Sequence, residues 1–178
     1  MEYEIAIILI SILLSGFFSG MEIAFVSSNR FQVELEKKKE GFIAKIIGKI
    51  TSKSSKFITT MLVGNNIALV VYSIFMGKLI LDVLPISELN NFSILLIQTI
   101  ISTLIILVTA EFLPKAIFRI YANEMLKFFA VPAYFFFLIF HFISNFITVI
   151  SDYFLKTFFN TAKDVEQTEF SKEELGNY

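Results

Sequence analysis

The sequence predicts an all-α membrane protein with three transmembrane helices, and composition is the first reason. The chain has 178 residues, of which 56% are hydrophobic and 17% charged, and its mean hydropathy is +0.73. Soluble domains average about 45–50% apolar and about 25% charged residues. The second reason is three apolar runs, each at least as long as the about 20 residues that span a bilayer. They cover about residues 5–26, 57–81 and 92–120.

The first run follows two acidic residues, Glu2 and Glu4. A secretory signal peptide begins instead with a positively charged region. We therefore expect this run to remain in the protein as its first span.

The segment from Ser27 to Lys56 is predicted to be cytoplasmic, because it holds eight basic and three acidic residues. Loops rich in Lys and Arg stay on the cytoplasmic side of a membrane. In a cell membrane the N-terminus then lies outside. The third span ends inside, near Lys115, Arg119 and Lys127, and the C-terminus is cytoplasmic.

The same segment is predicted to form short belt helices over about residues 29–50. After Gly41, apolar residues recur at helical spacing, while Lys45 and Lys49 lie on another face. This pattern is typical of a helix in the membrane interface, and the alternative is a solvated basic turn. The apolar residues are Phe42, Ile43, Ile46, Ile47 and Ile50.

The second run contains G-N-N at residues 64–66, and the loop that follows it carries Asp82 and Glu88 but no Lys or Arg from residue 82 to residue 91. This loop is predicted to be extracellular.

The third run contains one acidic residue, Glu111, in the string T-A-E-F-L-P-K. A carboxylate within a membrane span is costly and marks a candidate functional site. The first run carries the polar string S-G-M-E at residues 19–22, so each predicted span has one polar interruption.

The three interruptions are predicted to lie at one depth in the membrane. With cytoplasmic ends at Ser28, Phe57 and Ile120, nine residues separate each end from Ser19, Asn66 and Glu111 respectively. At about 1.5 Å per residue, each polar group lies about 13 Å inside. We therefore expect the three helices to form a cation site together.

The donors at this level are oxygen atoms, which Mg²⁺ and Ca²⁺ prefer. Ser19 offers a hydroxyl, Asn65 and Asn66 offer amide oxygens, and Glu111 offers a carboxylate. The chain has no Cys and one His, which excludes disulfides, thiolate sites and multi-His zinc sites.

Four further groups are weaker candidates for this site. Pro114 is expected to kink its helix and to free the carbonyl of Ala110, because proline has no N–H to donate. Gly64 would let an ion approach the backbone, as would Gly16 and Gly20. Glu22, three residues after Ser19, could line an exit path or pair with a loop lysine.

Purely structural roles are open for the same residues. Glu111 and Lys115 are four apart and can form an ion pair on one helix face. Asn65 and Asn66 can form interhelical hydrogen bonds, and Ser19 can bond to its own helix backbone.

A fourth apolar run, from Phe128 to Ile150, is long enough to span the membrane but is interrupted by Pro132, His141 and Ser144. A fourth span would place the C-terminus outside. We instead predict a largely buried juxtamembrane hairpin or bend, with juxtamembrane helices over about residues 124–160.

The strings S-G-M-E-I-A-F, L-V-G-N-N and E-F-L-P-K, in this order, resemble the transmembrane domain of the cyclin M/CorC magnesium transporters (CNNM). The resemblance covers about Ile5 to Asp164. It implies three transmembrane helices, belt helices, a juxtamembrane segment and a homodimer. It also implies a magnesium ion held by Ser19, Asn65 or Asn66, and Glu111.

The resemblance further implies sodium-linked magnesium export, with Na⁺ as a possible coupling ion. An enzyme is not expected, because the sequence has no Ser-His or His-Asp arrangement and no paired carboxylates at catalytic spacing. Residues 1–163 would form the transmembrane domain, and residues 164–178 an acidic tail leading to an absent cytoplasmic CBS region that can bind ATP. The alternatives are a magnesium-sensing module and a structural membrane dimerisation module, neither of which transports ions. Nothing in the charge pattern suggests a nucleic-acid partner.

Overall fold

The computed structural model describes residues 2–84 and 90–159, and all secondary structure in these ranges is helical. This confirms the predicted all-α class. The elements are α1 (Glu2–Ser27), α2 (Arg30–Lys37), α3 (Phe42–Thr51), α4 (Ser54–Val83), α5 (Asn91–Ile106), η1 (Leu107–Phe112), α6 (Leu113–Ile120), α7 (Ala122–Phe128), α8 (Ala130–Ile139) and α9 (His141–Phe159).

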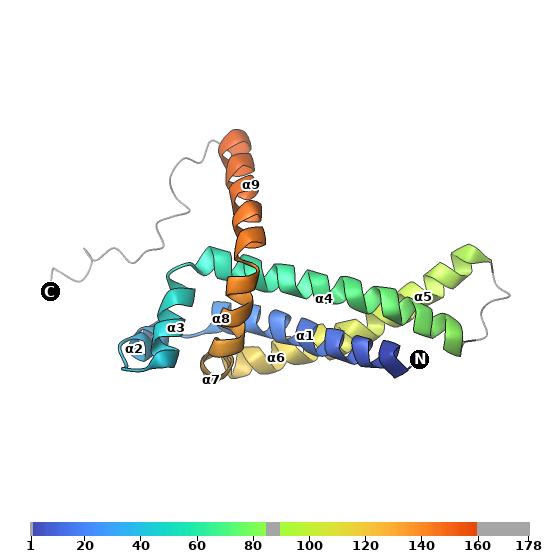
Figure 1. Cartoon of the computed structure of the whole chain (residues 1–178), viewed down its shortest axis with the longest axis horizontal. Helices are drawn as coiled ribbons and strands as arrows, with labels where there is room; N and C mark the ends of the chain where they lie inside the picture. The colour runs from blue at the N-terminus through green and yellow to red at the C-terminus, as the bar shows by residue number, and fades with distance from the viewer. Residues whose placement is uncertain (1, 85–89, 160–178) are drawn as a thin grey trace.

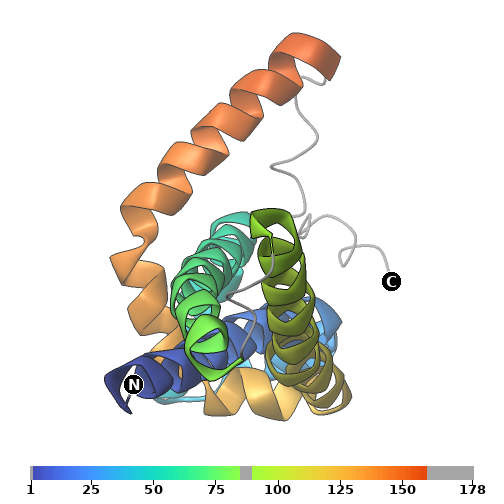
Figure 2. The same cartoon turned by 90° about the vertical axis from the view of Figure 1, so that its right-hand side faces the viewer.

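Within the described residues, three helical segments are each long and apolar enough to cross a membrane. They are α1, α4 and the continuous segment Asn91–Ile120, which comprises α5, η1 and α6. Figures 1 and 2 show them side by side, with α1 between α4 and α6. The third span begins beside α4 and ends beside α1, so α1 is the central helix of the bundle.

The segment between α1 and α4 folds into two short helices. The side chain of Asn29 accepts hydrogen bonds from the backbone N–H groups of Phe31 and Gln32, which caps α2. Gly41 then has φ 144° and ψ 169°, a conformation open essentially to glycine alone. This glycine therefore lets the chain turn from α2 into α3.

The amphipathic pattern of α3 is divided between two environments. Ile46, Ile47 and Ile50 are buried in the main hydrophobic core. Phe42 and Ile43, in the first turn at the α2 end, remain exposed. The exposed pair is consistent with an interfacial helix, since apolar side chains of such a helix enter the lipid boundary.

The fourth apolar run is broken into three helices. Phe129 separates α7 from α8, and these helices together are apolar enough for a span but are bent by 64° at their junction. Phe140 separates α8 from α9. The 10 residues of α8 are only about 15 Å long, so the run does not form one straight span.

Burial also differs along this run. Residues Ala130, Ala133 and Phe137 of α8 are buried in the main core, as predicted for a juxtamembrane segment. In α9, by contrast, Ser144 is buried but most apolar side chains described are exposed. The expectation of a largely buried segment is therefore wrong for α9, because this helix leaves the bundle instead of folding back onto it (Figure 1).

Candidate functional site

Helix α4 meets α1 at the G-N-N string, just before the first polar motif of α1. The Ser15 hydroxyl donates a 2.6 Å hydrogen bond to the Asn65 side-chain oxygen, and both residues are buried. A methyl group on Gly64 would lie 2.6 Å from the ring of Phe18. The G-N-N string therefore lies level with residues 15–18 of α1, one turn or less from Ser19.

The other side of α1 meets the third motif. A methyl group on Gly16 would lie 3.0 Å from Cγ of Pro114 and 3.8 Å from Cα of Ala110. Gly20 is in equally close contact with Phe118, whose ring would be 2.7 Å from such a methyl group. Two glycines four residues apart thus allow η1 and α6 to approach α1 closely. The structure therefore places the second and third motifs beside residues 15–20 of α1, so that Ser19 lies about one turn from the Ser15–Asn65 contact.

Ser19 lies on α1 between the contact of Ser15 with Asn65 and the contact of Gly16 with Pro114. We call this region, where α1 meets both α4 and α6, the motif seam. Successive helical residues are rotated by about 100°, so Ser19 lies about 40° from Ser15 in the direction of Gly16. Its side chain is fully buried, and its hydroxyl has no hydrogen-bond partner among the described residues. The alternative in which Ser19 bonds to its own helix backbone is therefore not what the structure shows. A buried polar group without a partner requires an explanation, and an ion is one.

The two asparagines of α4 face different surroundings. Asn65 is 7% exposed and bonded to Ser15, whereas Asn66 is exposed. A rotation of about 100° between neighbours explains the difference. Within one chain Asn65 is therefore the asparagine that faces α1, and the Asn66 side chain lies outside this seam.

Glu111 lies in a π-helical turn. The N–H of Leu113 bonds to the carbonyl of Val108, five residues back, instead of four. The Glu111 carboxylate lies 3.6 Å from the ammonium of Lys115, and the two side chains are 36% and 39% exposed respectively. π-helical turns occur frequently at functional sites, and here the turn carries the predicted acidic ligand.

Pro114 follows the π-helical turn as the second residue of α6, a position near a helix start where proline is tolerated. Its missing N–H leaves one carbonyl without a helical donor. That carbonyl belongs to Ala110 in an α-helical register and to Thr109 in the π-helical register. The prediction for Ala110 assumed a regular α-helix, and the π-helical turn makes Thr109 a second candidate.

The remaining predicted positions surround this seam. Gly64 and Ala110 are buried in the helix contacts, so their backbones face packed protein. Glu22 is half-buried, about one turn beyond Ser19 on α1.

Sequence reasoning missed Ser15, the partner of Asn65. The available signal was its spacing, since Ser15 lies four residues before Ser19 and therefore on the same helix face. It also missed the π-helical turn, which changes the phase of Glu111 relative to the rest of the third span.

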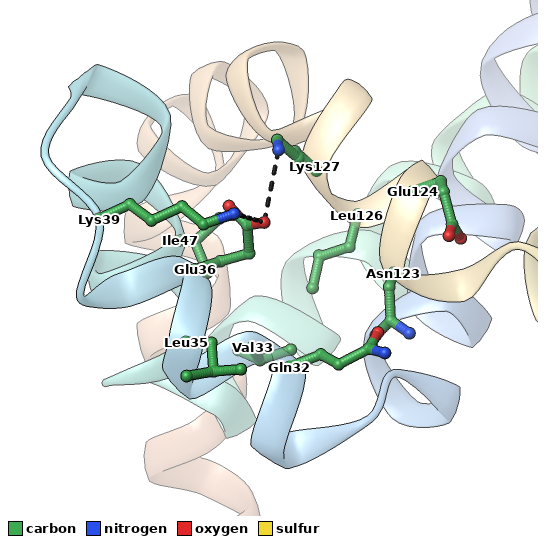
Figure 3. A pocket seen from close by; sticks show the side chains of 10 residues that line it. All are labelled: Gln32, Val33, Leu35, Glu36, Lys39, Ile47, Asn123, Glu124, Leu126 and Lys127. Atoms are coloured by element: carbon green, nitrogen blue, oxygen red, sulfur yellow. Dashed lines mark hydrogen bonds and ion pairs between the residues drawn. The ribbon is translucent and has the colours of Figure 1, made fainter.

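A separate cavity of about 420 Å³ lies between α2, α3 and α7 and shares no lining residue with the motifs (Figure 3). At its edge Glu36 accepts hydrogen bonds from Lys39 at 2.5 Å and from Lys127 at 3.4 Å. The hydrogen bond from Lys39 is the largest cause that lowers the pKa of Glu36. Together with a bond from the Asn29 N–H to the Asn123 side chain, this ion pair links α2 to α7.

Among the predicted ligands, Glu111 is the one carboxylate; its side chain is 36% exposed and paired with Lys115, whereas Ser19 and Asn65 are buried. The described residues contain no group of three or more His, Cys, Asp or Glu side chains that could hold a metal ion. Magnesium sites typically use one or two carboxylates and keep several waters. The donor set therefore suits a hard cation that is bound reversibly.

Comparison with known proteins agrees with the motifs. The family model described as the cyclin M transmembrane N-terminal domain (CNNM) matches residues 5–178. No curated protein matches the chain. The family consists of membrane modules related to divalent-cation transport. Nearly the whole chain is matched, so this protein belongs to the cyclin M transmembrane N-terminal domain family.

Proposed function

We propose that this domain transports magnesium ions across the cell membrane by sodium-linked export. In this proposal a partly or fully dehydrated Mg²⁺ binds where the three motifs meet. The observation that carries the proposal is the Ser19 hydroxyl, which is fully buried and has no hydrogen-bond partner in the part of the chain that the structure describes. Unpaired polar groups are costly in a membrane, so a transient ligand gives this hydroxyl a role.

The proposed ligands comprise one charged group and several neutral oxygens. Glu111 supplies the single negative charge, and Ser19 and Asn65 supply neutral oxygens. The Asn65 oxygen already accepts the Ser15 hydroxyl, but an amide oxygen has two lone pairs and can also bind a cation. The Asn66 side chain is exposed outside the motif seam. In this proposal it is therefore a ligand only for an ion that approaches from that side.

Lys115 is proposed to neutralise Glu111 between transport events. At 3.6 Å the pair is longer than a tight charge-assisted hydrogen bond of about 2.7–2.9 Å. A divalent ion would replace the lysine, because it brings two positive charges to the same carboxylate. The pair therefore prevents an isolated charge in the membrane without fixing the site in one state.

The topology and the assembly are parts of the same proposal. The N-terminus would lie outside and the C-terminus in the cytoplasm, and two copies would form a homodimer. A cytoplasmic CBS region would follow in a longer protein. The support is the charge pattern of the loops and the family to which the chain belongs.

The direct test is magnesium flux into vesicles that contain the purified domain. A magnesium-sensitive dye inside the vesicles reports entry, with and without an opposing sodium gradient. We expect flux for the native chain and a loss of flux for Glu111→Gln, which removes the charge but keeps the shape. The matched control is Glu40→Gln, an acidic residue exposed near α2, which should transport normally.

Binding is measured separately by thermal unfolding in detergent. An ion at about 100 times its dissociation constant stabilises the folded state by about 2.7 kcal/mol. Binding without flux, in the native chain, would favour a magnesium sensor. Neither binding nor flux would reject the proposal.

A second candidate function is a structural dimerisation module. The observations that favour it are the Ser15–Asn65 hydrogen bond and the Glu111–Lys115 ion pair, which give both polar motifs a role in packing. This function leaves the buried Ser19 hydroxyl without a role. It predicts that magnesium has no effect on the stability of either the native chain or Glu111→Gln.

A further inference from the structure

Helix α9 carries an uncovered apolar stripe along one face. Its members follow a spacing of three, four or seven residues, which places them on one side of a helix. The stripe consists of Phe142 (84% exposed), Phe146 (62%), Val149 (58%), Ile150 (40%) and Tyr153 (69%). Large apolar side chains of this kind require a covering partner.

The opposite, polar face of α9 docks onto α4. The hydroxyls of Ser144 and Thr60 are both buried and form a 2.8 Å hydrogen bond. Next to them the Lys56 ammonium donates a 2.7 Å hydrogen bond to the Asn145 side chain. A helix that docks in water buries its apolar face and exposes its polar one. The reversed orientation of α9 indicates that its outer surroundings are not water.

The docking point lies at the edge of the hydrocarbon layer. Helix α4 has 30 residues and is therefore about 45 Å long, against about 30 Å for the hydrocarbon core. If α4 is centred, about 7 Å extends on each side. Thr60 is six residues from the start of α4, or about 9 Å along the helix. Lys56, one turn earlier, is then at the level of the lipid headgroups.

The course of α9 agrees with this level. Figure 1 shows that α9 begins beside α4 and runs out of the bundle, roughly perpendicular to the three spans, which run side by side. It leaves beside the first part of α4, at the same end of the bundle as α3, whose Phe42 and Ile43 are also exposed. A helix that runs across the spans at the hydrocarbon edge lies in the plane of the membrane.

We propose that α9 is an interfacial helix, and that its stripe is covered by lipid acyl chains of the leaflet on the α2–α3 side. It would enter the headgroup–acyl boundary by about 5–10 Å, as amphipathic interfacial helices do. The Ser144–Thr60 and Asn145–Lys56 bonds would fix its depth against α4. This inference requires only that the chain is a membrane protein and is independent of the ion that it transports.

The test uses the absence of Trp from the chain, because one introduced Trp becomes the only such fluorophore. Phe146→Trp and Phe142→Trp, each reconstituted as the full chain, are measured in phospholipid vesicles. One set of vesicles carries bromine near the headgroup end of the acyl chain and another carries it near the chain end. We expect blue-shifted Trp emission. The fluorescence should be quenched more by lipid brominated near the headgroup than by lipid brominated near the chain end, and only weakly by aqueous acrylamide.

Two matched controls show how strongly each quencher acts on a Trp in water and on a Trp deep in the membrane. Ser151→Trp lies on the same helix, exposed about half a turn from the stripe, and should be quenched more by acrylamide. Leu104→Trp, 60% exposed in the middle of the third span, should lose most emission in the deep-brominated lipid. Acrylamide quenching of both stripe variants would overturn the proposal. Protection from both quenchers would also overturn it, because a second copy of the chain would then cover the stripe.

Discussion

At the residue scale, the motif seam depends on very small side chains. Gly16 and Gly20 admit Pro114 and Phe118 of α6, and Gly64 admits the ring of Phe18. These contacts draw three spans together around Ser19, whose hydroxyl is fully buried and has no hydrogen-bond partner among the described residues. Close packing and an unpaired hydroxyl are therefore two consequences of the same short side chains.

Replacing Ser19 with alanine separates an ion ligand from a packing residue. Ser19→Ala removes an unpaired buried hydroxyl, so the free energy of unfolding without magnesium should rise by about 1–3 kcal/mol. Stabilisation by magnesium should disappear at the same time. Thermal unfolding in detergent, with and without magnesium, measures both. A Ser19→Ala variant that keeps the full magnesium response would rule out this ligand.

Ser15→Ala is the matched control for that variant, since it lies one turn away. It leaves the Asn65 side chain without its hydrogen bond. We expect a loss of about 1–3 kcal/mol in the free energy of unfolding, because a buried polar group becomes unpaired. The two substitutions should therefore change stability in opposite directions.

The glycine contacts make a second prediction at this scale. In Gly64→Ala the new methyl group would meet the Phe18 ring at 2.6 Å. Phe18 is 2% exposed and packs against the ring of Phe136 at a centroid distance of 4.8 Å, so it has little room to move. We expect a loss of about 1–3 kcal/mol from overpacking, measured by denaturation in mixed detergent.

Gly48→Ala is the control for the glycine substitution. This glycine lies within α3, and a methyl group on it would meet nothing within 4 Å. Alanine should stabilise the helix by about 1 kcal/mol relative to glycine. Equal losses at Gly48 and Gly64 would show that the contact with Phe18 is not the cause.

At the element scale, two breaks in regular helix determine how the chain presents polar groups. The π-helical turn before Pro114 changes the phase of Glu111 within the third span. The break at Phe140 releases α9 from the direction of α8. In each case the helix on the far side of the break is fixed by contacts with another span: α6 by α1, and α9 by α4.

The two hydroxyls that join α9 to α4, those of Ser144 and Thr60, should contribute unequally to stability. The Thr60 hydroxyl also donates to the Lys56 carbonyl at 2.8 Å, so its one proton is used and Ser144 is the donor between the two. Thr60→Val therefore leaves a buried donor unpaired and should cost about 1–3 kcal/mol. Ser144→Ala leaves only an acceptor unmet and should cost less. Unfolding of both single variants and the double variant measures this difference.

The double variant provides the decisive comparison. Because replacing both partners by apolar groups can be nearly neutral, Thr60→Val with Ser144→Ala should be more stable than Thr60→Val alone. Strict additivity of the two losses would show that the hydroxyls are not coupled.

At the scale of the whole molecule, the uneven loop charges should orient the bundle. The segment that contains α2 and α3 is basic, whereas the loop before α5 lacks Lys and Arg from residue 82 to residue 91. The chain contains no Cys, so any introduced Cys is a unique label. Lys38→Cys and Asn91→Cys mark opposite ends of the bundle at exposed positions.

An impermeant maleimide applied to intact cells tests the orientation. Asn91→Cys should be labelled directly, whereas Lys38→Cys should be labelled only after the membrane is opened, because basic loops remain inside. The parent chain serves as the blank. Direct labelling of Lys38→Cys in intact cells would invert the proposed topology.

The sequence alone determined the class, the three apolar spans and the family motifs of this protein. Hydropathy and spacing are properties of a single segment, so span length and polar interruptions such as Glu111 can be found without knowing any neighbour. The same local rules predicted a helix over residues 42–50, and the structure contains α3 there.

Only the tertiary structure decided how these helices are rotated and joined. It turned Asn65 towards Ser15 and left Asn66 exposed, and it left the Ser19 hydroxyl buried without a described partner. It also divided the fourth apolar run at Phe129 and Phe140. The physical reason is that rotation and bending depend on which side chains meet across helices. In this bundle three glycines of two spans set those contacts, and a hydropathy profile does not contain them.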